Sequence, residues 1–401
     1  MGARRLLATV LLLAAGCGAS PDEPPAADRV PPVLDEIGEG EGSLRLVATA
    51  GYVEDGASDH DVDWVTPFEE RTGCRVEVRY ADSAEEMLAL MRREGDEVYD
   101  GISAPGDVAG ELIAGGEVHP VDPQLFPSYR QVLEPLRGDG ARHYVVDGRV
   151  YGVPALYGPN ALLFATGEVD PAPTSWDVVF EPEPPLAGRV SMFDSPMAIA
   201  DAALYLAAHR PELGIEDPYA LTPTQLDAAT ALLETQEPDV ALYWTRFTEQ
   251  VDAFAEREVL VGAGWPIALG LLDLGSRPVE AAEPVEGMTG WADTWMVSAE
   301  APHPNCMLKW MNWTLRPEVQ AQMALWYGAA PSNGRACPLL RDALGGLADV
   351  VGTIRFGRCG DEAFLGSLAL WRMPTVECGD DRGRACTGYP AWRLRWRSVR
   401  D

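Results

Sequence analysis

Hydrophobic residues recur along this chain at two different periods. Between residues 43 and 48 apolar side chains occupy alternate positions, as in a strand, whereas Trp64, Val65 and Phe68 follow helical spacing until Gly73 ends the helix. The same alternation then repeats, with expected strands at 76–80 and 99–103 and an expected helix at 84–93. Strand, helix, strand, helix, strand predicts a parallel sheet flanked by helices.

Elements of both kinds are expected in the rest of the chain. Strands are predicted at 149–154, 161–164 and 259–263, and helices at 198–208, 225–233 and 307–315. In open parallel sheets, ligands bind beyond the carboxyl ends of strands, so the residues that follow strands are the first candidates for a site.

The residues in these positions are aromatic or acidic. They are Tyr52, Asp107, Tyr157, Asp194, Trp265, Trp291 and Asp293. Trp291 and Asp293 are two residues apart, so on a strand both side chains face the same way. Rings hold the apolar chain and charge of an alkylammonium ligand, and a carboxylate takes its ammonium group. The alternative is that Trp291 packs in a hinge, Asp293 caps a turn and Trp265 belongs to the core.

The first residues of the chain predict export. Arg4 and Arg5 precede a short apolar run at 6–15, and Leu13-Ala14-Ala15-Gly16-Cys17 matches the cleavage site of a bacterial lipoprotein signal. The apolar run is shorter than the roughly 20 residues that span a bilayer. We therefore expect a signal peptide at 1–16 and lipidation of Cys17, with an ordinary signal peptide as the alternative.

Composition limits the classes of partner. The chain has 401 residues, of which 47% are hydrophobic, and this is enough for two domains with real cores. A formal net charge of −31 disfavours nucleic acid and favours cationic partners, or serves only solubility. Residues 17–42 are rich in Pro, Gly and acidic side chains and lack periodicity, which is typical of a disordered tether.

Six cysteines remain besides Cys17, an even number for an oxidising compartment. We expect Cys337 to pair with Cys359 and Cys378 with Cys386, because each pair closes a short loop, and this leaves Cys74 with Cys306. A zinc site is the alternative, but the sequence has no Cys-x-x-Cys and no His at ligand spacing from these cysteines. No metal and no cofactor are expected.

Sequence motifs of catalysis are absent. The chain has no His-Glu-x-x-His, no Gly-x-Ser-x-Gly and no phosphate loop, and its five histidines are isolated in sequence. We therefore expect no catalytic residue and no enzymatic turnover.

Several stretches, in the right order over more than 250 residues, resemble the binding components of bacterial ABC importers, and within them the spermidine/putrescine-binding, Ydc-type branch. They are Gly51-Tyr52, Asp63-Trp64-Val65-Thr66-x-Phe68-Glu69-x-x-Thr72-Gly73-Cys74, Gly158-Pro159-Asn160, Ile199-Ala200-Asp201-Ala202-Ala203-Leu204, Thr289-Gly290-Trp291-Ala292-Asp293-Thr294, and His303-Pro304-x-Cys306-x-x-Lys309-Trp310-Met311-Asn312-Trp313.

The resemblance implies an α/β fold of two lobes, the type II periplasmic-binding fold, with mostly parallel sheets and a ligand cleft between the lobes. The expected division is lobe 1 at 43–155 and 293–334, lobe 2 at 156–292, and a disulfide-containing C-terminal extension at 335–401 that braces lobe 2. It also implies that Trp265, Trp291 and Asp293 line the cleft, and that Asp293 holds an amine.

The chain departs from the expected pattern in three places. After the first strand it has Thr49-Ala50-Gly51-Tyr52 where the branch has Trp-Pro-Gly-Tyr, so one ring is missing. Of the second acidic pair of spermidine binders only Asp194 remains, and Asp107 stands where an aromatic residue is usual. A polyamine is the first expected ligand, with another amine, an amino-acid-like solute or a sugar as alternatives.

The expected partners follow from the resemblance. They are a small cationic solute and the permease subunits of an ABC importer, with the membrane contacted only through the lipid anchor and no nucleic acid bound. The protein is expected to be a monomer outside the cytoplasm, anchored to the cell membrane or facing the periplasm. A secreted enzyme and a sensor or adhesion protein on the same scaffold are the alternatives.

Overall fold

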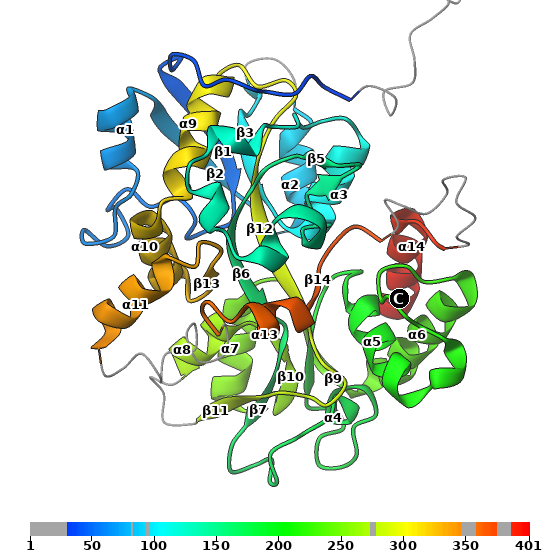
Figure 1. The fold of residues 1–401 in the computed structure, drawn as a ribbon. Helices are drawn as coiled ribbons and strands as arrows, with labels where there is room; N and C mark the ends of the chain where they lie inside the picture. The colour runs from blue at the N-terminus through cyan, green and yellow to red at the C-terminus, as the bar shows by residue number, and fades with distance from the viewer. Residues whose placement is uncertain (1–29, 82, 94–96, 273–277, 346–357, 375–385) are drawn as a thin grey trace, which may run out of the picture.

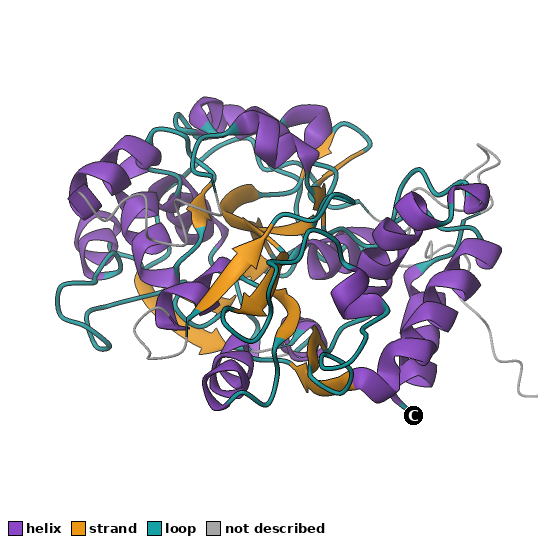
Figure 2. Ribbon diagram, turned by 90° about the horizontal axis from the view of Figure 1, so that it is seen from below, coloured by secondary structure: helices purple, strands orange, loops and turns teal. Residues whose placement is uncertain are grey.

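The chain folds into two β-sheets, one above the other in Figure 1, with helices around them. The computed structural model describes residues 30–81, 83–93, 97–272, 278–345, 358–374 and 386–401. Figure 2 shows the strands in the interior and the helices on the outside.

The first sheet has the strand order β13-β6-β12-β3-β1-β2, and β14 pairs with β12. β2 and β3 run parallel to β1, whereas β12 is antiparallel to both β3 and β6. The strands are β1 (Ser43–Ala48), β2 (Arg75–Tyr80), β3 (Gly101–Ala104), β6 (Val153–Pro159), β12 (Thr289–Val297), β13 (Ala330–Pro331) and β14 (Ala369–Leu370).

The second sheet has the order β11-β7-β10-β8-β9, in which β8 runs parallel to both neighbours. Its strands are β7 (Ala161–Ala165), β8 (Val190–Phe193), β9 (Val240–Trp244), β10 (Val261–Gly264) and β11 (Val279–Ala282), and a small hairpin joins β4 (Val145–Val146) to β5 (Arg149–Val150). Every residue of β6 and β12 is buried, and one hydrophobic core extends across both sheets.

Local sequence sets where the helices begin and end. Gly73 ends α1 in the left-handed conformation (φ 72°), which glycine adopts at least cost, and Thr222 forms a capping box with Gln225 at the start of α6. The helices are α1 (Thr66–Thr72), α2 (Ala84–Met91), α3 (Gly106–Ala114), α4 (Asp177–Phe180), α5 (Ala198–His209), α6 (Pro223–Gln236), α7 (Phe247–Glu256), α8 (Pro266–Leu272), α9 (Pro304–Thr314), α10 (Pro317–Tyr327), α11 (Ala336–Leu344), α13 (Glu362–Ser367) and α14 (Tyr389–Arg400). Within the described residues, no helix is both long and apolar enough to span a bilayer.

The predicted β-α-β-α-β pattern that begins at residue 43 is confirmed. β2 and β3 each pair with β1 in parallel, and α1 and α2 lie in the connections. The predicted strands at 161–164 and 259–263 correspond to β7 and β10, and the predicted helices at 198–208, 225–233 and 307–315 to α5, α6 and α9, with shifts of a few residues at the ends.

The prediction of a disordered tether as far as residue 42 is wrong for residues 30–42, which lie against the fold. Leu34 pairs with Val121 in a β-bridge, and the Glu41 carboxylate accepts hydrogen bonds from the backbone N–H groups of Asn305 and Cys306. A Cβ at Gly40 would lie 2.7 Å from the Cys74 sulfur. The glycines that suggested disorder therefore allow the backbone to approach a disulfide closely; residues 17–29 lie outside the described part.

Two predicted disulfides are confirmed. Cys74 is bonded to Cys306 and Cys337 to Cys359. Cys386 is also disulfide-bonded, but its predicted partner Cys378 lies outside the described residues.

The C-terminal extension contacts helices that belong to each of the two sheets. Figure 1 shows α14 beside α5 and α6 of the second sheet, and Arg395 of α14 pairs with Asp227 of α6. On the other side, Arg393 of α14 lies 3.7 Å from Glu111 of α3, a helix that follows the first sheet's β3. The extension thus ties the two halves of the molecule together.

Candidate functional site

Aromatic side chains gather where the two sheets meet. Trp291 lies on β12 of the first sheet and Trp265 follows β10 of the second, and their ring centroids are 6.1 Å apart. The ring of Tyr327, at the end of α10, lies 6.2 Å from Trp291 and 4.8 Å from Tyr52, which follows β1. We call these four residues the ring cluster.

Trp291 owes its position to a glycine on the neighbouring strand. Gly158 of β6 is in register with Trp291, and a Cβ at Gly158 would lie 2.8 Å from the Trp291 ring. Contacts this short do not occur between real atoms, so the indole lies over the β6 backbone only because position 158 has no side chain.

Asp293 adds a buried carboxylate to the ring cluster. It is only 6% exposed, and burial raises its pKa to about 7, helped by the nearby negative charge of Asp107 and opposed by the Tyr52 hydroxyl. Among the described residues no arginine, lysine or histidine lies within ion-pair distance of Asp293. A carboxylate held among rings without a cationic partner is suited to an organic cation.

Asp107 and Asp194 have partners in the C-terminal extension. The Tyr389 hydroxyl donates a hydrogen bond to Asp107 over 3.3 Å, and burial raises the pKa of Asp107. The Trp396 indole N–H donates to Asp194 over 2.9 Å, and the Arg400 guanidinium lies 3.4 Å from the same carboxylate. Asp107 lies close enough to Asp293 to affect its pKa, but both Asp107 and Asp194 are already engaged.

Tyr157 is not brought to the ring cluster. It lies on β6 in register with Ala292, and neighbouring residues of a strand face opposite sides, so Tyr157 and Trp291 lie on opposite faces of the sheet. Burial raises the pKa of Tyr157, and so does the negative charge of Asp361 in the C-terminal extension.

The sequence reasoning missed Tyr327 and Trp371. The Trp371 ring stacks on Phe193 with centroids 5.4 Å apart, and lies 6.5 Å from Trp265. The abundance of tryptophan after residue 337 was the only signal available, and nothing in the spacing of these residues indicated that one of them reaches Trp265.

A chain of buried hydrogen bonds orients Trp265. Its indole N–H donates to Asn160 Oδ1 (3.0 Å), Asn160 Nδ2 donates to Thr289 Oγ1 (2.6 Å), and the Thr289 hydroxyl donates to Asp201 Oδ1 (2.5 Å). Burial raises the pKa of Asp201 to about 7, and the Thr289 hydroxyl opposes this shift. Each donor faces one acceptor, so the chain fixes the direction in which the Trp265 ring points.

We expect Thr289→Val to lower the free energy of unfolding by about 1–3 kcal/mol, because it leaves Asp201 and Asn160 buried without their shared partner. Urea denaturation at pH 8 measures this loss. Thr248→Val, at an exposed position of α7, is the matched control. An equally small loss of unfolding free energy in both variants would show that these hydrogen bonds contribute little to stability.

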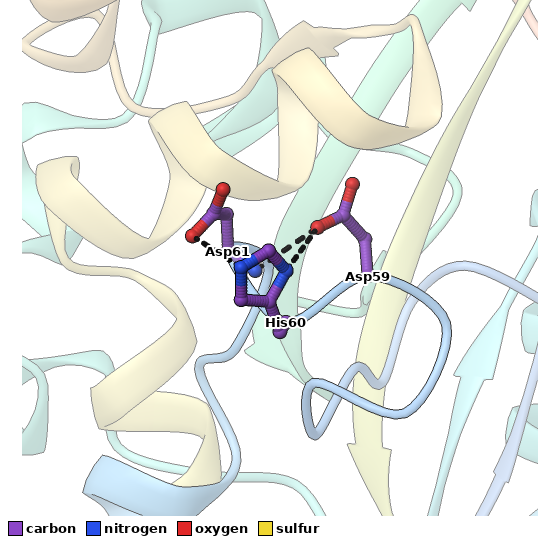
Figure 3. A group of neighbouring side chains, drawn as sticks. All are labelled: Asp59, His60 and Asp61. Atoms are coloured by element: carbon purple, nitrogen blue, oxygen red, sulfur yellow. Dashed lines mark hydrogen bonds and ion pairs between the residues drawn. The ribbon is translucent and has the colours of Figure 1, made fainter.

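One group of described residues has the composition of a metal site. Figure 3 shows Asp59 and Asp61 on either side of His60, with ligand atoms within 4.8 Å of one another. All three residues are exposed and adjacent in one loop, and the His60 ring nitrogens lie 3.5 Å and 3.6 Å from the two carboxylates. Contacts between neighbouring side chains of one exposed loop account for this arrangement, and we assign no metal to it.

A cavity of about 370 Å³ lies beside the C-terminal extension, away from Asp293. Its lining includes Arg142 and Arg372, both of which pair with Asp217. None of the residues of the ring cluster lines this cavity.

Comparison with known proteins agrees with this architecture. The sequence profile of the bacterial extracellular solute-binding proteins matches residues 63–336, more than half of the chain. The Escherichia coli K12 spermidine/putrescine-binding periplasmic protein is 25% identical over 308 residues, which cover 75% of this chain and 84% of that protein. The putrescine/agmatine-binding protein of Pseudomonas aeruginosa is 24% identical over 306 residues, covering 70% of this chain and 79% of that one.

The fold is that of solved periplasmic binding proteins. The substrate-binding protein PotD of a Streptococcus pneumoniae spermidine/putrescine ABC transporter superimposes with a TM-score of 0.65 at 16% identity, covering 90% of this chain and all of that one. The expected two-sheet periplasmic-binding fold is thereby confirmed, but the expectation of mostly parallel sheets is wrong. Both sheets are mixed, because β12 pairs antiparallel with β3 and β6, and β13 with β6, in the first sheet, and β7 pairs antiparallel with β10 and β11 in the second. Proteins of this family bind small solutes outside the cytoplasm for ABC transporters and are not enzymes. With its profile match and its fold in agreement, this chain belongs to the bacterial extracellular solute-binding proteins.

Proposed function

We propose that this protein captures a small organic cation and delivers it to the permease of an ABC importer. The observation that carries the proposal is Asp293, a carboxylate buried among Tyr52, Trp291 and Tyr327 with no cationic side chain in ion-pair distance within the described residues. Rings and a carboxylate together replace the water that an ammonium group loses on burial.

Polyamines are the first ligands to test. Curated relatives are named for spermidine, putrescine and agmatine. We propose that this chain belongs to the polyamine-binding, Ydc-type branch of the family. Trp265 and Trp291 supply ring faces for an alkyl chain, and Asp293 supplies the charge for one amine.

Ligand capture requires the two halves to move. Asp293, Trp291 and Tyr327 are each at most 6% exposed, so the arrangement described above corresponds to a closed state. We infer a hinge motion between the half built on the first sheet and the half built on the second, which opens the ring cluster to solvent and closes it over the ligand.

The protein acts at the membrane surface in this proposal. The signal at 1–16 directs export, and the lipid on Cys17 holds the protein beside its permease; both lie outside the described residues. The binding domain itself is monomeric.

A thermal-shift screen of the mature protein tests the proposed function. The panel contains putrescine, spermidine, n-butylamine, quaternary amines, amino acids and simple sugars. A ligand at about one hundred times its Kd adds about 2.7 kcal/mol to the free energy of unfolding, which raises the Tm by several degrees. We expect shifts with amines; shifts with sugars alone, or with none of these compounds, would contradict the proposal.

A further inference from the structure

The C-terminal extension is joined to the strand that carries Trp291 and Asp293. β14 pairs with the start of β12, with Ala369 opposite Thr289 and Leu370 opposite Gly290, and the backbone N–H of Trp371 donates to the Gly290 carbonyl over 2.6 Å. The extension therefore reaches the edge of the ring cluster through backbone hydrogen bonds. These bonds fix the position of the Trp371 backbone.

Trp371 then enters the aromatic contacts around Trp265. Its ring is 5% exposed and lies nearly parallel to Phe193, at an interplanar angle of 18°. Trp265 contacts Phe193, Trp371 and Trp291, at centroid distances of 5.4, 6.5 and 6.1 Å. Trp371 thus belongs to the same group of aromatic contacts as Trp265.

Two glycines of α3 make room for residues 371–373. A Cβ at Gly106 would lie 1.7 Å from the carbonyl oxygen of Trp371, and a Cβ at Gly110 would lie 2.3 Å from the Cβ of Met373. The positions are one helical turn apart and on one face of α3, so the helix leaves a groove where residues 371–373 lie. Arg372 also pairs with Asp217 in the connection before α6, so this segment is held by a second contact.

The extension also binds Asp107 and Asp194, the other acidic side chains that a long polyamine would need. Tyr389 bonds Asp107, and Trp396 and Arg400 hold Asp194, the residue after Phe193. Arg400 gives Asp194 the kind of cationic partner that a second ammonium group would otherwise provide. Within the described residues neither Asp107 nor Asp293 has such a cationic partner, but the hydroxyl on Asp107 comes from Tyr389 of the extension, whereas the hydroxyl beside Asp293 is that of Tyr52 in the ring cluster.

We propose that the C-terminal extension limits the ligand to one ammonium group, held at Asp293, and that Trp371 is the residue that closes the site against longer polyamines. This inference rests on the proposed function, since it specifies which amines the same site accepts. A cation with a single charged head and a short apolar body satisfies Asp293 and the rings, whereas the further ammonium groups of spermidine would have to displace Tyr389 from Asp107 or Arg400 from Asp194.

The test compares n-butylamine, putrescine and spermidine by isothermal titration calorimetry on the full mature chain. Butylamine and putrescine have the same carbon chain and differ by one ammonium group. We expect butylamine to bind at least as tightly as putrescine and at least tenfold more tightly than spermidine. We expect Trp371→Ala to strengthen spermidine binding at least tenfold and to change butylamine binding less than threefold.

Two further variants separate size from charge. Trp396→Phe with Arg400→Gln keeps Trp371 but frees the Asp194 carboxylate, and we expect it to strengthen putrescine binding relative to butylamine at least fivefold. Trp313→Ala, at a tryptophan of α9 that lies between Arg71 and Arg316, is the control and should leave the three amine affinities unchanged. The double variant also gives an answer if Trp371→Ala does not fold.

The outcomes distinguish the two proposals. If unmodified protein binds spermidine as tightly as butylamine, the limit to one ammonium group is wrong and the capture of amines stands. If spermidine binding stays weak in both the Trp371 and the Asp194-releasing variants, the extension does not set the limit. If none of the three amines binds any of the proteins, the proposed function fails, and this inference fails with it.

Discussion

Replacing Asp293 with asparagine is expected to weaken amine binding by about 2–4 kcal/mol, because the ammonium group loses its charged partner in a buried site. The same change should stabilise the free protein at pH 8 by about 1–3 kcal/mol. Burial raises the pKa of Asp293 to about 7, so ionised Asp293 costs folding free energy that asparagine does not. Calorimetric titration and urea denaturation measure the two effects.

This combination distinguishes a ligand-binding carboxylate from a structural one. The pKa of Asp293 in the folded protein lies above its ordinary value near 3.8, so its destabilising effect is present above about pH 7 and disappears as the pH falls towards 4. The stability gained by Asp293→Asn should therefore disappear at pH 4. Asp61→Asn, at an exposed carboxylate, is the control. A variant that lost stability at pH 8 would show that Asp293 has a structural partner.

Ligand affinity should depend on pH through the same group. Tyr52, Tyr327 and Asp107 are the titratable groups around Asp293, and burial keeps both tyrosines neutral near pH 7 by raising their pKa. An amine needs the ionised carboxylate, so we expect affinity to fall by up to tenfold per pH unit below about pH 7 and to level off above it. Asp293→Asn should bind weakly at every pH; a wild-type affinity unchanged between pH 5.5 and pH 8 contradicts this role.

The parts of the fold that follow from local patterns were predictable from sequence. The alternation in β1 and the glycine after α1 depend on residues close together in the chain, and both were confirmed. The i, i+2 spacing of Trp291 and Asp293 likewise placed both on β12, where they are buried.

The rest of the site depends on contacts between distant parts of the chain. Trp371 reaches the neighbourhood of Trp265 only because β14 pairs with β12, and no local pattern specifies that pairing. Asp194 follows a strand as expected, but its partners come from α14, more than 200 residues later. The side that Tyr157 faces depends on the register between β6 and β12, which includes an irregularity that periodicity cannot reveal.

Removing the disulfide between Cys74 and Cys306 is expected to have the largest effect on stability. The bond joins residues 232 positions apart, linking the end of α1 to α9. In the loop-entropy description, a cross-link that closes so long a loop restricts the unfolded chain strongly and contributes about 5 kcal/mol. We expect Cys74→Ala with Cys306→Ala to lower the free energy of unfolding by about that amount in urea denaturation.

The second disulfide provides a matched control, because Cys337 and Cys359 are almost as buried as Cys74 and Cys306 but only 22 positions apart. Loop entropy gives this shorter closure about 3 kcal/mol, so Cys337→Ala with Cys359→Ala should cost less by about 1–2 kcal/mol. Gly40 and Glu41 pack around the Cys74–Cys306 bond, and their contacts add to the difference. Equal losses from the two pairs would mean that packing around each bond, and not restriction of the unfolded chain, determines its contribution.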